Sequence, residues 1–205
     1  MNIDAIMTAA PVIPVLVLDG SHDPAALASI LVAAGLPVIE VTLRTPKALA
    51  AIEAMTAIPG AIVGAGTVLN ASQLDEALSA GATFIISPGL TEPLAKAAMA
   101  SGVPYLPGIA NASDIMRGLD LGIQRFKFFP AEAAGGIPAL KGLSAPFCGL
   151  RFCPTGGITA ATAPDWLALE SVACVGGSWV VPRGATLAQV GDLARQAAAL
   201  SGPTN

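Results

Sequence analysis

Short apolar runs alternate with longer alanine-rich stretches along the whole chain. The short runs are rich in β-branched and aromatic residues and are predicted to be strands, whereas the alanine-rich stretches are predicted to be helices. The predicted strands are 12–18, 38–43, 62–65, 84–86, 105–106, 125–128, 151–153 and 172–175. The predicted helices are 3–8, 24–34, 46–55, 71–80, 92–100, 112–121, 138–143, 160–169 and 187–200.

This alternation is typical of an α/β protein with a parallel sheet. Eight strands, each followed by a helix, predict a (β/α)8 TIM barrel, a single domain spanning residues 1–205, with a short helix ahead of the first strand. A doubly wound open sheet is the alternative. It usually has fewer strands and a glycine-rich fingerprint after its first strand, whereas Gly64-Ala65-Gly66 follows the third.

The chain is 54% hydrophobic and 12% charged, so a membrane protein has to be considered first. The uncharged run 24–39 is slightly short for a span and is interrupted by Gly35 and Pro37, which favours a buried helix followed by a strand. Asp4 stands where an export signal would have basic residues, so we expect a cytoplasmic protein. The net charge of -4, without a basic run, argues against nucleic-acid binding.

The few cysteines and the single histidine limit the chemistry further. Cys148, Cys153 and Cys174 are odd in number and lack metal-ligand spacing, so we expect free thiols. His22 is expected to be solvated ahead of helix 24–34, with Asp23 as its N-cap. A site built on several imidazoles is excluded.

Lys127 stands out because aromatic residues flank it on both sides. Strand alternation directs Lys127, with Arg125 and Phe129, to one face of the sheet and Phe126 and Phe128 to the other. Burial favours the neutral amine over the ammonium ion, and a neutral amine can attack a carbonyl and form a Schiff base. The alternative is a lysine that reaches from the strand end to water.

The second predicted strand carries a carboxylate and a guanidinium. Its alternation places Glu40, Thr42 and Arg44 on the barrel side, and the intervening apolar residues against the helices. Glu40 can then act as a general acid and base, and Arg44 can bind a substrate carboxylate in a bidentate fork. A structural ion pair between Glu40 and Arg44, or between Glu40 and Arg125, is the alternative.

Three glycine-rich loops follow later strands. Thr67 ends the first, where it could bind the same carboxylate or cap helix 71–80. The other two, Pro154 to Ile158 and Gly176 to Ser178, follow the last two strands, which hold phosphate in many barrels. Their backbone N–H groups, with a short helix from Ser178, predict an anion site.

Six motifs cover nearly the whole chain in order. They are Glu-Val-Thr-Leu-Arg-Thr (40–45), Gly-Ala-Gly-Thr-Val (64–68), Ser-Pro-Gly (87–89), Phe-Lys-Phe-Phe-Pro-Ala-Glu (126–132), Arg-Phe-Cys-Pro-Thr-Gly-Gly-Ile (151–158) and Gly-Gly-Ser-Trp (176–179). Taken together, these motifs resemble those of the bacterial 2-keto-3-deoxy-6-phosphogluconate (KDPG) aldolases. The resemblance implies a metal-independent class I aldolase without a cofactor. It also implies a cytoplasmic homotrimer of the Entner–Doudoroff pathway, acting on a phosphorylated keto sugar acid.

The resemblance also implies a role for each matched residue. Lys127 would form the Schiff base and Glu40 would transfer protons. The implied contacts to substrate are Arg44 and Thr67 to the pyruvate carboxylate, Pro88 and Phe129 as apolar walls, Thr155 to sugar hydroxyls, and Gly156, Gly157, Gly177 and Ser178 to phosphate. The loop 16–21 lacks the basic residue that members of this family often have, which leaves Arg183 as a candidate cation.

Other functions remain open at this stage. A sugar-phosphate epimerase on the same barrel would not need Lys127, and its metal-dependent form is disfavoured by the lone histidine. A non-catalytic phosphosugar-binding protein would gain nothing from a buried lysine and glutamate. Sibling aldolases acting on 4-hydroxy-2-oxoglutarate or on the phosphogalactonate epimer are closer alternatives, although Thr155 favours the gluconate configuration.

Overall fold

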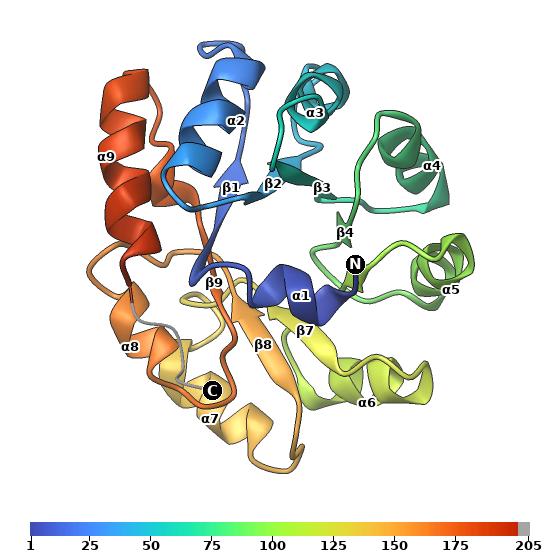
Figure 1. Cartoon of the computed structure of the whole chain (residues 1–205). Helices are drawn as coiled ribbons and strands as arrows, with labels where there is room; N and C mark the ends of the chain where they lie inside the picture. Colours follow the sequence, from blue (N-terminus) through green and yellow to red (C-terminus); the bar gives the residue numbers. More distant parts are fainter. Residues whose placement is uncertain (201–205) are drawn as a thin grey trace.

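The computed structural model describes residues 1–200 and confirms the alternation of strands and helices (Figure 1). The strands are β1 Val12–Leu16, β2 Val38–Thr42, β3 Ile62–Gly66, β4 Ile85–Ile86, β5 Tyr105–Leu106, β6 Gly108–Ile109, β7 Arg125–Phe128, β8 Arg151–Pro154 and β9 Val175–Gly177. The helices are α1 Ile3–Met7, α2 Pro24–Ala33, α3 Ala48–Thr56, α4 Ala71–Ser79, α5 Glu92–Ser101, α6 Ala112–Asp120, α7 Gly136–Ser144, α8 Ala163–Leu167 and α9 Leu187–Ala198, with the 3-10 turn η1 Ser178–Val180.

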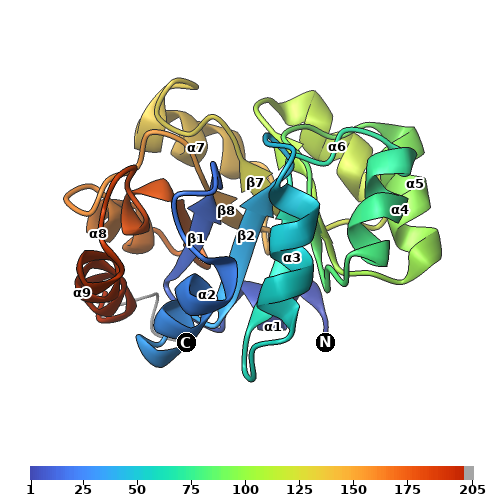
Figure 2. The same cartoon turned by 90° about the horizontal axis from the view of Figure 1, so that it is seen from above.

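The strands form a curled parallel sheet with helices α2 to α9 around its outside (Figures 1 and 2). Hydrogen bonding divides the strands into a six-stranded sheet in the order β5-β4-β3-β2-β1-β9 and a three-stranded sheet in the order β6-β7-β8. Two isolated parallel bridges, Phe152 to Val172 and Thr155 to Gly176, join β8 to the segment of β9. The parallel α/β class is confirmed, whereas the ladders do not form one closed eight-stranded ring.

The fifth predicted strand, 105–106, is confirmed as β5, whereas β6 was not predicted; Pro107, which has no N–H to donate to a ladder, separates the two strands. The Pro107 carbonyl accepts a hydrogen bond from Lys127 N at 2.9 Å, so the chain continues from the first sheet directly into the second. The last predicted strand, 172–175, is displaced to Val175–Gly177. The predicted helix 160–169 is reduced to Ala163–Leu167.

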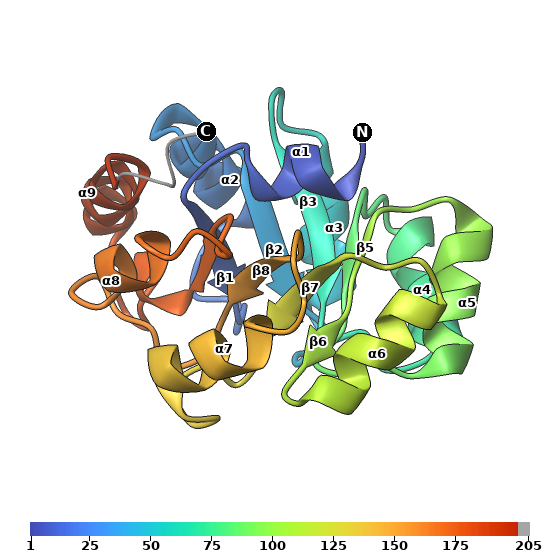
Figure 3. The ribbon, with the colours of Figure 1, turned by 90° about the horizontal axis from the view of Figure 1, so that it is seen from below.

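Helix α1 lies across one end of the curled sheet, which Figure 3 shows from below. Its residues Ile6 and Met7 are buried among side chains from both sheets. The other members of this interior cluster are Ile13, Val38, Phe84, Ile86, Leu106, Cys153 and Cys174. Arg125, at the start of β7, forms an ion pair with Asp4 of the same helix. The N-terminal end of the sheet is therefore filled and covered, which leaves the opposite end for a site.

The outer core lies between the strands and the surrounding helices. On β2, Ile39 and Val41 belong to this core, while Glu40 points to the other side, as the alternation predicted. Helix α2 begins as predicted, with the Asp23 side chain accepting from Ala26 N and Pro24 in the first turn. No helix within residues 1–200 combines the length and the apolarity that a membrane crossing needs.

Candidate active site

Lys127 and Glu40 meet inside the curled sheet. The Lys127 Nζ donates to Glu40 Oε1 at 2.9 Å and to Oε2 at 3.1 Å. Both residues are buried, with 4% and 2% of their surfaces exposed. Lys127 therefore does not reach out to water, and the partner of Glu40 is this lysine instead of Arg44 or Arg125. The sequence alone did not predict this pair.

Small and aromatic neighbours shape the space around the pair. A Cβ on Gly66 would lie 2.1 Å from Glu40 Oε1, so glycine is required for this carboxylate position. The Phe129 ring lies over the amine, with its centroid 5.5 Å from Lys127 Nζ. The Phe129–Pro130 peptide bond is cis. An amine between a carboxylate and an aromatic face is held in one place and largely shielded from water.

Arg44 differs from its predicted position. Strand β2 ends at Thr42, and Arg44 is exposed in the turn that follows. Thr42 is buried on the strand, where its hydroxyl donates to Leu16 O at 2.8 Å. Arg44 thus lies at the carboxyl edge of the sheet and not inside it, in contrast to Glu40.

Thr67 has a φ of 60°, which is the left-handed region and unusual for a β-branched residue. Such strain often occurs at functional sites. The capping role considered for Thr67 is wrong, because the N-cap of α4 is Asn70, whose side chain accepts from Gln73 N at 2.9 Å. The half-buried Thr67 directly follows Gly66, the glycine beside Glu40.

Pro88 lies in a loop held by a short hydrogen-bond chain. The Ser87 hydroxyl donates to Gly89 O at 2.7 Å, so the Tyr105 hydroxyl, also 2.7 Å away, donates to Ser87 Oγ. Burial raises the pKa of Tyr105, which keeps this phenol in its donating form. A Cβ on Gly108 would lie 2.1 Å from Pro88 O, so the loop also depends on that glycine. Tyr105 was not among the predicted site residues, although a lone tyrosine on a buried strand needs a partner for its hydroxyl.

Thr155, Gly156 and Gly157 follow β8 and pair with the turn after β7. Ala131 N donates to Thr155 O at 2.8 Å and Glu132 N donates to Gly156 O at 3.0 Å. Gly156 and Gly157 have φ values of 105° and 82°, which favour glycine. These hydrogen bonds place the loop Thr155 to Gly157 beside the loop that begins at Phe129.

Glu132 and Trp166 hold the same pair of loops from outside. The Trp166 Nε1 donates to Glu132 Oε1 at 2.9 Å, and a Cβ on Gly157 would lie 2.7 Å from Glu132 Cβ. Glu132 lies in the motif 126–132, and the sequence indicated no role for it. Its partner Trp166 lies on α8, more than thirty residues later, so no local pattern joins the two.

Gly177 and Ser178 follow the last strand. A Cβ on Gly177 would lie 2.5 Å from the Trp179 ring, and one on Gly176 would lie 2.3 Å from Thr155 Oγ1. Ser178 is exposed and begins η1, which contains only three residues. The short helix expected here is therefore a single 3-10 turn.

Two thiols lie in the interior cluster, next to the lysine. Cys153 is paired in register with Lys127 across β7 and β8. A hydrogen bond with Cys174 lowers the pKa of the Cys153 thiol, and the positive charge of Lys127 lowers it further. The same hydrogen bond, together with burial, raises the pKa of Cys174. All three cysteines are free thiols, with Cys148 exposed, and residues 1–200 contain no group of three potential metal ligands.

A buried amine in contact with a buried carboxylate, surrounded by loops that follow parallel strands, is the arrangement of an enzyme site. Comparison with known proteins also indicates an enzyme. The model of the KDPG and KHG aldolase family matches residues 3–198, and the chain belongs to this family.

Two curated relatives match over almost the whole length. The 2-dehydro-3-deoxy-phosphogluconate aldolase of Zymomonas mobilis is 57% identical over 199 residues, covering 97% of this chain and 96% of the relative. The KHG/KDPG aldolase of Escherichia coli is 52% identical, covering 95% and 93%.

Two solved structures are also similar. One is the 2-keto-3-deoxy-6-phosphogluconate aldolase of Zymomonas mobilis with 3-phosphoglycerate, at a TM-score of 0.95 and 56% identity, covering 98% of this chain and 96% of that one. The other is the KDPG aldolase of Legionella pneumophila with pyruvate captured as a covalent carbinolamine intermediate. It has a TM-score of 0.93 and 44% identity, covering 97% and 99%.

Proposed function

We propose that the chain is a class I aldolase of the Entner–Doudoroff pathway. It cleaves 2-dehydro-3-deoxy-6-phospho-D-gluconate to pyruvate and D-glyceraldehyde 3-phosphate. The observation that carries the proposal is the contact between the buried Lys127 amine and the buried Glu40 carboxylate. The names of the similar aldolases, and the pyruvate carbinolamine of the Legionella enzyme, support it.

In the first half of the reaction, Glu40 accepts a proton from Lys127 and leaves a neutral amine. The amine adds to the C2 carbonyl of the substrate and gives a carbinolamine. Loss of water then produces an iminium ion, which can accept an electron pair. The 2.9 Å contact allows the proton transfer without movement of either strand.

In the second half, Glu40 removes the proton of the C4 hydroxyl through a water molecule. The C3–C4 bond breaks, its electrons pass to the iminium, and glyceraldehyde 3-phosphate leaves. The remaining enamine is protonated at C3, and hydrolysis releases pyruvate and restores Lys127. One carboxylate thus acts first as a base and then as an acid.

The substrate contacts are assigned to residues of the loops that follow the strands. Arg44 and Thr67 bind the pyruvate carboxylate, Pro88 and Phe129 form apolar walls, and Thr155 contacts sugar hydroxyls. The position of Arg44 at the carboxyl edge and the strained backbone of Thr67 support the first of these roles. The phosphate is assigned to the loop residues Gly156, Gly157, Gly177 and Ser178.

A sibling activity on 4-hydroxy-2-oxoglutarate, or on the phosphogalactonate epimer, is the second candidate. The E. coli relative is named for both the KHG and KDPG activities, which favours the first of these. Each of these sibling reactions would use the same lysine and the same pyruvate half of the substrate as the proposed reaction.

We further propose that the two sheets act as one closed (β/α)8 barrel, a single domain over residues 1–205. The isolated bridges between β8 and β9, and the continuous chain across Pro107, support closure. The enzyme is proposed to be a cytoplasmic homotrimer that needs no metal or cofactor.

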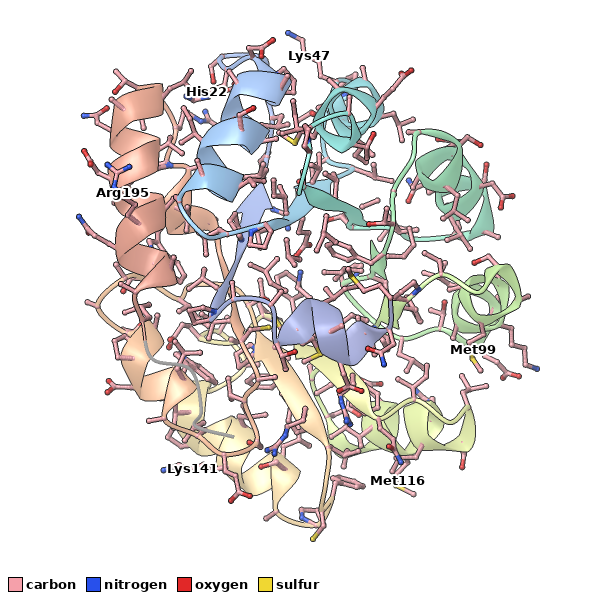
Figure 4. All side chains as sticks on the ribbon, in the orientation of Figure 1. His22, Lys47, Met99, Met116, Lys141 and Arg195 are labelled. Atoms are coloured by element: carbon pink, nitrogen blue, oxygen red, sulfur yellow. The ribbon has the colours of Figure 1, made fainter. Side chains whose placement is uncertain are left out.

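Borohydride trapping with pyruvate tests the chemistry directly. We expect a reduced pyruvate adduct on the Lys127 peptide by mass spectrometry, and no adduct in Lys127→Ala. Lys141→Ala is the matched control, because Lys141 is an exposed lysine on α7 that projects away from the sheet (Figure 4) and should leave trapping unchanged. Folded wild-type protein that forms no adduct would contradict the Schiff-base mechanism.

A further inference from the structure

A cavity of about 390 Å³ opens between the loop after β1 and the segment after β9. It includes Ser178, to which the proposed function assigns a phosphate contact. The other lining residues that matter here are Asp19, Ser21, His22 and Arg183. The cavity therefore runs from Ser178 along the segment that precedes α9, as far as Arg183.

Arg183 is the one lysine or arginine that lines this cavity within the described chain. The ion pairs within residues 1–200 do not include it. Its guanidinium can therefore present several N–H donors to an anion.

His22 fixes the segment that carries Arg183. The His22 Nε2 lies 2.7 Å from Ala185 O and donates to it, so Nδ1 accepts from Ser21 Oγ at 3.1 Å. His22 is half-buried in this position, which corrects the expectation that it is solvated. Figure 4 places it between helices α2 and α9. The loop after β1 is thus tied to the turn Pro182 to Ala185.

The glycine loops alone supply only neutral N–H groups. The 3-10 turn at Ser178 has three residues, too few to add a substantial helix dipole. A phosphate monoester carries nearly two negative charges at neutral pH, and charge-assisted hydrogen bonds are about twice as strong as neutral ones. A cation at this end of the site would therefore add much of the affinity.

We propose that Arg183 binds the phosphate group of the substrate and gives the enzyme its preference for phosphorylated aldehydes. This inference rests on the proposed aldolase function. Arg183 is then a specificity-determining residue that acts on binding and takes no part in the chemistry at Lys127.

Asp19 is the acidic residue on the same cavity, and it competes with phosphate for Arg183. Its carboxylate is held by Ser21, whose backbone N–H donates to Asp19 Oδ1 at 2.9 Å. Hydrogen bonds from Ser21 lower the pKa of Asp19, and the charge of Arg183 contributes to the same effect. An Asp19→Asn variant keeps the acceptor for Ser21 and removes the charge.

The test compares condensation of pyruvate with D-glyceraldehyde 3-phosphate in three variants. Arg183→Met should raise KM for this aldehyde by about ten- to a hundredfold. Arg183→Lys should restore part of the loss, and Asp19→Asn should lower KM a few-fold. Arg117→Met on α6 is the matched control, because it removes the same charge from an exposed residue outside the cavity.

A second readout separates this inference from the aldolase function itself. Exchange of the pyruvate methyl protons with solvent deuterium needs Lys127 and Glu40 but no aldehyde, so Arg183→Met should leave it unchanged. An unchanged KM in Arg183→Met would overturn the role of Arg183, as would a parallel loss of proton exchange. A wild-type enzyme without pyruvate exchange would instead refute the aldolase function.

Discussion

At the scale of single residues, Gly66 has the strictest requirement in the site. The Glu40 carboxylate occupies the space where a side chain would begin, with Oε1 only 2.1 Å from an added Cβ. We expect Gly66→Ala to displace Glu40 from Lys127 and to lower kcat by about a hundredfold or more, because small misplacements of catalytic groups are costly. Steady-state kinetics on protein shown to be folded by circular dichroism measures this.

Gly142→Ala is the control for this substitution. Gly142 lies within α7, and nothing lies within 4 Å of an added Cβ. Alanine there should leave kcat unchanged and stabilise the helix by about 0.5 to 1 kcal/mol. Wild-type activity in Gly66→Ala would show that the carboxylate position is not needed.

Single residues also show what the sequence could and could not predict about the site. Alternation correctly placed Glu40 and Lys127 inside the sheet, because a strand has a fixed two-residue period. The same rule did not apply to Arg44, since β2 ends at Thr42, one residue before the predicted end, and Arg44 lies in the exposed turn that follows. The left-handed backbone of Thr67 could not be predicted, because threonine disfavours it and only tertiary packing maintains it.

At the scale of elements, the helices and strands were predictable in type and order. Their boundaries depended on contacts that no local pattern contains. The unpredicted strand β6 begins just after Pro107, whose carbonyl accepts from Lys127 N, a partner twenty residues later in the chain. Helix α1 was predicted, but its position across the end of the sheet follows only from the packing of Ile6 and Met7 against the interior cluster.

Helix α1 therefore gives a stability prediction. Met7 is fully buried among side chains from both sheets. We expect Met7→Ala to lower the free energy of unfolding by about 2 to 5 kcal/mol, because it leaves a cavity that the surrounding strands cannot fill. Urea denaturation followed by circular dichroism measures the change.

Leu69→Ala serves as the control, since Leu69 in the loop after β3 is 55% exposed. Its effect on unfolding should stay within about 0.5 kcal/mol. Folded Met7→Ala should keep its activity at low temperature, because α1 lies at the opposite end of the sheet from the catalytic loops. Equal stability of the two variants would show that α1 is not part of the core.

At the scale of the whole molecule, one end of the curled sheet is filled by α1 and the other carries the glycine loops. This division explains how so small a chain supports a buried ion pair. The apolar cluster fixes the strands below Lys127, and the loops above it carry the residues proposed to bind substrate. The contact between β8 and the segment of β9 consists of two isolated bridges, which no single-strand pattern could have predicted.

Helices α5 and α6 carry exposed apolar side chains on the outer surface. Met99 on α5 and Met116 on α6 are exposed and project from neighbouring helices (Figure 4), and Leu119 on α6 is also exposed. Apolar side chains that gather on a surface often mark a contact between chains. For the proposed homotrimer, we expect sedimentation equilibrium to give a mass of about three times the 20.3 kDa of one chain, as a ring closed by a threefold axis would. A mass of one chain at assay concentrations, in enzyme that still traps pyruvate, would contradict the trimer and leave the aldolase chemistry intact.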